Sequence, residues 1–281
     1  MTALQSELDD HPVHHYAADQ RTSLVQEWRD IVRSGHLLYS LVWRDLTVRY
    51  KRSFIGWFWT MLHPLMLTVI LVIVFSEVFR YTVPHYEVYV LSALLPWSFT
   101  SQTTVTSMAA IQWNGSLMKR VRVPKSIFTL SITLAGLVNL AFAYVPLLGI
   151  MLLRGAPIRP AILFLPVSVL ILAVFTFGLS LALSAIAVYF LDLREMYAVA
   201  LTALMYLTPI IYPASIVPDR FRLFLLLNPF VYMINIVRTP VFEGTLPSNH
   251  NLAVAAGLAV VSVIGGWTIF RRLSRGFYPY L

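Results

Sequence analysis

Few residues of this chain have the type and spacing that enzyme chemistry requires. None of the three lysines, Lys51, Lys119 and Lys125, follows a glycine, so the sequence has no glycine-rich phosphate loop ending in lysine. The chain has no cysteine, which excludes disulfides, thiolate metal sites and cysteine nucleophiles. We therefore expect no catalytic residue, no metal site and no cofactor in this chain.

The remaining titratable candidates each have a structural alternative. Asp192 and Glu195 could form an acid/base pair, but beside Arg194 in a short loop they also suit helix capping or contact with a partner. His63 is the one titratable group inside the first long apolar run. It could contact a substrate or a gate, or it could hydrogen-bond a neighbouring helix near the Pro64 kink.

The composition indicates which elements must position these residues. Hydrophobic residues make up 58% of the 281 residues and charged residues only 12%, whereas soluble domains carry about 25% charge. A water-soluble globular enzyme is therefore excluded, and the sequence predicts an integral membrane protein. The formal net charge of +8 needs no nucleic acid to explain it, because basic residues also gather at membrane surfaces.

Long apolar runs predict the membrane-spanning helices. A helix needs about 20 apolar residues to cross the hydrocarbon core. The predicted spans are residues 56–79, 88–111, 127–153, 161–191, 196–213 and 252–270. The second half of the run 88–111 is crowded with serine, threonine and glutamine, so we expect it to face protein or water rather than lipid.

A shorter apolar run, Leu223 to Val237, separates the last two spans and is interrupted by Asn228 and Pro229. It is too short to span untilted, so a re-entrant pair of half-helices fits better than a seventh span. Only six arginines fall in the predicted outer segments, and the other 15 of the 21 basic residues fall in the inner ones. Because basic loops stay cytoplasmic, this bias places both termini in the cytoplasm.

A polar tail, residues 1–35, precedes an amphipathic segment, residues 36–52. In this segment Tyr39, Val42, Trp43, Leu46 and Tyr50 recur at helical spacing, which predicts an interfacial helix. Its basic residues could dock a partner or simply anchor the chain at the surface. The sequence as a whole predicts an all-α integral membrane protein with six transmembrane helices, an N-terminal amphipathic interfacial helix and a re-entrant helical pair between spans five and six.

The loop between the second and third predicted spans, residues 114–125, is short, basic and closed by Pro124. It could form one helix across the cytoplasmic surface that presents Leu117, Met118 and Val121 to another protein. A positive-inside loop without a partner is the alternative.

Three segments resemble the permease subunits of type-2 ABC exporters, in the branch that moves polysaccharides or polyol phosphates. The most specific is the lead-in to the first span, with Arg49, Tyr50, Lys51, Arg52, Ser53, Gly56 and Trp59. A second resembles the family's coupling helix, with Asn114, Leu117, Met118, Lys119 and Arg120. A third resembles its outer gate, with Pro209, Tyr212, Asn228 and Pro229, followed by Arg238. His63 departs from the asparagine that is usual in the family.

The resemblance implies a permease that carries a lipid-linked polysaccharide, such as O-antigen, capsule or teichoic acid, across the bacterial cytoplasmic membrane. It implies a homodimer with two copies of a separate ABC ATPase that holds ATP and Mg²⁺, in contact with membrane lipid and without nucleic acid. Two alternatives remain from the residues: a type-2 ABC exporter of drugs or small lipids, and a membrane enzyme acting on polyprenyl lipids. The enzyme would need a cluster of acidic or histidine residues at an interface, and the sequence offers no convincing one.

Overall fold

The computed structural model describes residues 24–50, 58–74, 83–120 and 123–280. Every regular element in these ranges is a helix, in agreement with the all-α prediction. The α-helices are α1 Leu24–Arg33, α2 Gly35–Tyr50, α3 Phe58–Val72, α4 Tyr86–Trp113, α5 Gly115–Arg120, α6 Ser126–Leu153, α7 Leu165–Ala187, α8 Leu193–Leu207, α9 Arg222–Leu227, α10 Pro229–Arg238 and α11 Asn249–Leu273.

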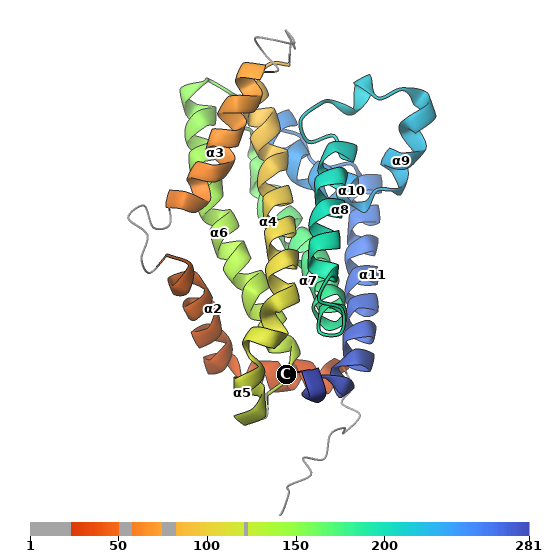
Figure 1. Ribbon diagram of the computed structural model, residues 1–281. Coiled ribbons are helices and arrows are strands. Elements are labelled where there is room, and N and C mark those ends of the chain that lie inside the picture. The colour runs from red at the N-terminus through yellow and green to blue at the C-terminus, as the bar shows by residue number, and fades with distance from the viewer. Residues whose placement is uncertain (1–23, 51–57, 75–82, 121–122, 281) are drawn as a thin grey trace, which may run out of the picture.

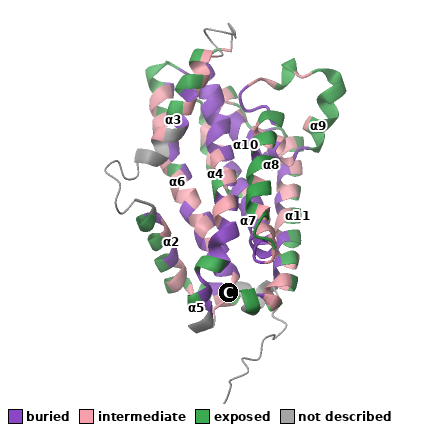
Figure 2. Ribbon diagram, in the orientation of Figure 1, coloured by how far each residue is buried: buried purple, intermediate pink, exposed green. Residues whose placement is uncertain are grey.

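The long helices α3, α4, α6, α7, α8 and α11 lie side by side along one axis (Figure 1). Helix α5 and the C-terminus lie at one end of this bundle, the α5 end, and α9 lies at the other, the α9 end. Helices α4 and α10 occupy the buried centre, whereas α8 and α9 are largely exposed (Figure 2). The interface of α7 with α11 is the most extensive between the described helices.

Length and composition support three of the predicted spans directly. Ser126–Leu153, Pro160–Ala187 and Asn249–Gly276 each have 28 helical residues and are apolar enough to cross a membrane. Helix α4 also has 28 residues but carries the polar second half noted in the sequence. Helices α3 and α8 have 15 described residues each, so their spans, and the count of six, stay predictions.

The helix α8 ends at Leu207, before the predicted boundary at residue 213. The cause is local, because a residue that precedes proline is disfavoured in the helical region. Thr208, which precedes Pro209, has extended backbone angles, with φ −102° and ψ 134°. The chain then continues to α9 through an irregular stretch with short 3₁₀ turns at Ala214–Ile216 and Asp219–Phe221.

Helix α2 packs on the bundle through leucine side chains and leaves two of its aromatic side chains exposed. Leu41 and Leu46 are buried and α2 packs along α6, whereas Tyr39 and Trp43 are 68% and 56% exposed. The aromatic side chains therefore point away from the protein, which suits contact with lipid headgroups. In the segment expected to be a tail, residues 24–33 form the helix α1, which buries Ile31.

Candidate functional site

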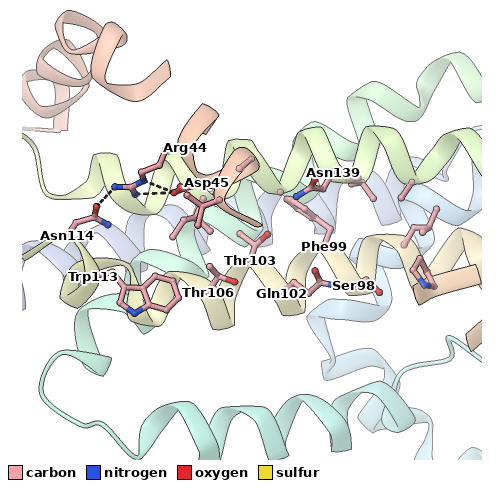
Figure 3. A pocket seen from close by; sticks show the side chains of 18 residues that line it. Arg44, Asp45, Ser98, Phe99, Gln102, Thr103, Thr106, Trp113, Asn114 and Asn139 are labelled. Carbon is pink, nitrogen blue, oxygen red and sulfur yellow. Dashed lines mark hydrogen bonds and ion pairs between the residues drawn. The ribbon is translucent and has the colours of Figure 1, made fainter. Parts of the chain in front are cut away.

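A cavity of about 500 Å³ lies between α2, α3, α4 and α6 (Figure 3). Its lining is mainly apolar, but eight of the 18 lining residues are polar or charged, and Phe99 and Trp113 are its aromatic members. The polar lining residues are Ser98, Gln102, Thr103, Thr106, Asn114 and Asn139, with Arg44 and Asp45 from α2. Hydroxyl and amide groups can exchange hydrogen bonds with a polar ligand, and the aromatic faces can pack on its apolar surfaces.

The polar residues of α4 divide between packing and the cavity. Thr100 pairs with Thr176 of α7 at 3.1 Å between hydroxyl oxygens, and Tyr197 of α8 donates to the Thr104 hydroxyl at 3.0 Å. Gln102 and Thr106 each lie two residues further along, on the opposite face of the helix, and line the cavity instead. The polar half of α4 therefore has two faces: one packs on neighbouring helices and the other lines the cavity.

At the α5 end of the cavity, α2 is bonded to two other helices (Figure 3). Arg44 Nη1 donates to Asn114 Oδ1 at 2.9 Å, and Arg44 also pairs with its neighbour Asp45 at 3.0 Å. The Ser131 hydroxyl of α6 donates to Asp45 Oδ2 at 3.2 Å. Asn114 ends α4 and precedes α5, so these bonds join the predicted interfacial helix to the start of the predicted coupling helix.

The predicted coupling residues do not share one outward face. Asn114 is 5% exposed and bonded to Arg44, Met118 is 7% exposed within the chain's own core, and Leu117 is half-buried against that core. The expectation that Met118 is presented to another protein therefore needs correction, because α5 has only six residues and folds back onto the bundle. Lys119 and Arg120 lie in α5, but their side chains and Val121 fall outside the described residues.

The lead-in segment is described only in part. Arg49 and Tyr50 end α2, and Trp59 lies in the first turn of α3. Lys51, Arg52, Ser53 and Gly56 lie outside the described residues, as do the side chains of Arg49, Tyr50, Trp59 and His63.

At the α9 end, two of the predicted gate residues, Asn228 and Pro229, lie at the break between two helices. Asn228 Oδ1 accepts from the Phe230 backbone N–H at 3.0 Å, which caps α10, and Pro229 occupies its first position. Asn228 Nδ2 donates to the Thr208 hydroxyl at 2.9 Å, so the chain returns to where α8 ended. The helical segments on either side of Asn228 meet at 84°, which agrees with the predicted break in this run.

Three consecutive carbonyl groups beyond Pro209 accept hydrogen bonds from side chains of α4 and α10. The donors are Arg238 Nη2 to Ile210 at 3.0 Å, Tyr86 Oη to Ile211 at 2.7 Å and Tyr89 Oη to Tyr212 at 2.9 Å. Arg238 also donates to the Tyr89 hydroxyl at 2.9 Å and lies over its ring, 4.0 Å from the centroid. We call Arg238, Tyr86 and Tyr89 the carbonyl clamp.

Beyond the clamp, residues 213–227 form an exposed segment that we call the arm. None of its residues is buried, and four leucine and phenylalanine side chains of α9 are exposed. These are Leu223, Phe224, Leu226 and Leu227, at 59% to 72%. Arg220 and Arg222 of the arm are exposed as well.

Some residues of these sites were not identified from the sequence. None of Arg44, Asp45, Tyr86 and Tyr89 was singled out from the sequence as a site residue. Their partners lie 70 to 125 residues away along the chain, and sequence spacing carries no signal for such pairs. The position of Arg238, almost three turns after the asparagine–proline break, was a usable signal, because an arginine inside an apolar run must find acceptors.

The sequence matches the profile of the ABC-2 type transporter family over residues 36–242. The chain is 32% identical over 252 residues to the O-antigen export system permease protein RfbA of Myxococcus xanthus, covering 89% of this chain and 96% of that protein. The O-antigen export system permease protein RfbA of Klebsiella pneumoniae is 27% identical, covering 87% of this chain and 95% of that protein. The polysialic acid transport protein KpsM of Escherichia coli is 24% identical, covering 83% and 91%.

Proposed function

Because this chain belongs to the ABC-2 type transporter family, we propose that it is the membrane-spanning permease subunit of an ATP-driven exporter of a lipid-linked cell-envelope polysaccharide. The observation that carries the proposal is the similarity, over most of the chain, to permeases for O-antigen export and polysialic acid transport. We place it in the bacterial cytoplasmic membrane with both termini inside. The α5 end then faces the cytoplasm and the α9 end faces outward.

The cavity beside α4 supports a carbohydrate cargo. Sugars expose hydroxyls that need hydrogen-bond partners and apolar ring faces that stack on aromatic side chains. The cavity offers both, with Gln102, Thr106 and Asn139 near Phe99 and Trp113. The same face of α4 would form part of the wall along which the glycan passes.

A homodimer fits the exposure of α8. Of its 15 residues only Leu201 is buried, and Met196, Val199, Tyr206 and Leu207 are more than half exposed. One bundle is too small to enclose a pore for a hydrated glycan, and a two-fold pair is the commonest way for one chain to build a larger enclosure. We propose that α8 and the arm face their copies across the two-fold axis.

A separate ABC ATPase would supply the energy, with ATP and Mg²⁺ bound there. The permease sequence contains no glycine-rich phosphate loop. The ATPase would dock at the α5 end, where the exposed Ser116 and Trp113 flank the buried Asn114. We expect the purified permease to hydrolyse no ATP alone and to copurify with its ATPase when both are expressed. Saturable hydrolysis by the isolated chain, after controls for contamination, would contradict this.

Deleting the gene in its bacterial host tests the cargo. We expect the surface glycan to disappear while its lipid-linked form accumulates inside, detected with a lectin only after cells are permeabilised. Restoring the wild-type gene should reverse both changes. Unchanged surface glycan together with increased sensitivity to drugs would instead favour the alternative, a type-2 ABC exporter of drugs or small lipids.

A further inference from the structure

The α9 end contains two regions that are adjacent in the chain, one buried and one exposed. Thr208 and Ile210 are completely buried, and Ile211 is 6% exposed. The arm that follows contains no buried residue, and its helix α9 makes its main contacts only with the turn at Asp219–Phe221 and with α10. Burial therefore changes within a few residues, at Tyr212, from a buried segment to an exposed one.

Both ends of the arm are attached to the same buried base. On one side the carbonyl clamp binds three consecutive carbonyls, and on the other Asn228 caps α10. The bond from Asn228 to Thr208 joins the two sides directly. The Phe230 ring anchors the start of α10 between Trp97 and Phe175, at 5.2 and 5.8 Å between ring centroids.

We propose that the carbonyl clamp and the bond between Asn228 and Thr208 form a fixed base, and that the exit opens by motion of the arm relative to this base. Arg238 is then a positioning residue for export, since it holds the segment from which the arm extends. This inference rests on the proposed function, because it assigns the moving and the stationary parts of the outer gate.

We assign the motion to the arm because moving residues 210–212 instead would leave buried polar groups without hydrogen bonds. Displacing residues 210–212 would leave three carbonyls and the Nη2 of Arg238 without partners, beside an apolar cluster that includes Phe230 and Phe242. Among the residues that the structure describes, Arg238 Nε already has no hydrogen-bond partner. Unpaired polar groups in such surroundings are strongly unfavourable. Moving the arm breaks none of these bonds.

The chain has no cysteine, so single cysteines can report on each region. We choose Ile210→Cys for the base, Ser215→Cys for the arm and Ile127→Cys for a buried site at the α5 end, since Ile127 is also completely buried. The complete transporter, permease with its ATPase, is purified in detergent, where a polar maleimide reaches both ends of the bundle, and is labelled at rest and during ATP turnover.

With the clamp intact, we expect Ser215→Cys to label readily and Ile210→Cys to stay protected in both states. Adding Arg238→Met should raise the labelling rate of Ile210→Cys at rest at least tenfold, while Ile127→Cys stays protected. That third reporter separates loss of the base from general unfolding, which would expose both sites. Arg222→Met, which removes an exposed arginine of the arm, is the matched control and should change neither buried site.

Tyr89→Phe provides a second route if Arg238→Met does not fold. It removes the hydroxyl that accepts from Arg238 and donates to Tyr212, but keeps the ring beneath the guanidinium. Faster labelling of Ile210→Cys in this variant supports the proposal. The proposal is overturned if Arg238→Met and Tyr89→Phe leave position 210 protected, or if turnover alone exposes it in the intact clamp. Because labelling requires no glycan, these outcomes do not depend on the identity of the cargo.

Discussion

The contact between α7 and α11 leads to a prediction that can be worked through quantitatively. At Gly178 and Gly266 the two helices approach backbone to backbone. A Cβ atom added to Gly266 would lie 2.7 Å from the carbonyl carbon of Gly178 and closer still to its oxygen. Ordinary van der Waals contact begins near 3.4 Å. Small residues that allow such approach are the main means by which membrane helices associate.

The Gly266→Ala variant must therefore separate the backbones by more than 0.7 Å (3.4 minus 2.7). A gap of about 0.5–1 Å already loses a quarter to a half of the dispersion energy across a contact. The same separation would break the hydrogen bond from the Ser262 hydroxyl to the Phe175 carbonyl, 2.9 Å long in the wild type. Overpacking costs about 1–3 kcal/mol, and we expect the upper end of that range because backbone atoms cannot rotate away.

Thermal unfolding of the purified transporter in detergent measures this cost. For large domains about 1 kcal/mol lowers Tm by roughly 2–4 °C, so Gly266→Ala should lower it by about 6–12 °C. Gly265→Ala is the matched control, because a Cβ there meets no atom within 4 Å, and its Tm should change little. Gly178→Ala should resemble Gly266→Ala, and the double variant should be less than additive, since both act on one contact. Equal Tm values for Gly265→Ala and Gly266→Ala would refute the reasoning.

Three further predictions concern the two ends of the bundle. Ser116→Trp, at an exposed position of α5, should reduce copurification of the ATPase without lowering Tm. Met118→Ala should instead lower Tm by several degrees, because it leaves a cavity in the core. The reverse pattern would contradict the proposed docking face. Cysteines at Ser215 and Leu223 should react with an impermeant thiol reagent added outside cells, and labelling from the cytoplasmic side alone would reject the proposed orientation. Asn228→Ala removes both the cap of α10 and the bond to Thr208 and should cost about 1–2 kcal/mol, whereas Asn228→Asp retains the cap, loses only the amide donor to Thr208 and should cost less; an Asn228→Asp variant with the wild-type Tm would argue against a contribution from the bond to Thr208.

The elements bounded by charge or proline could be predicted closely from the sequence. The predicted spans 127–153 and 252–270 correspond to Ser126–Leu153 and Asn249–Leu273, because the apolar runs end at charged or polar residues. The break at Asn228 was predictable because proline cannot continue the preceding helix. The end of α8 was predicted too late, at residue 213. The apolar run continues past Thr208, but the helical backbone ends before it.

The side chains that build the sites were harder to predict, because their partners are remote. Met118 was expected to face outward from its apolar character, but a six-residue helix turns one face back onto the bundle, and only the tertiary fold decides which face. The bond of Arg44 to Asn114 crosses 70 positions and that of Arg238 to Tyr89 crosses 149. Periodicity identifies which residues share a face, but it does not say which face meets which helix.

The bond between Arg44 and Asn114 also links the transport cycle to the mechanics of the lipid bilayer. Helix α2 presents Tyr39 and Trp43 outward and is bonded at the same time to the residue that begins α5. If α2 lies at the membrane surface as proposed, a push on α5 from the ATPase must displace headgroups around those two rings. The lateral pressure of the bilayer then opposes each stroke, and turnover should depend on lipid headgroup size and membrane thickness even when cargo and ATP are saturating.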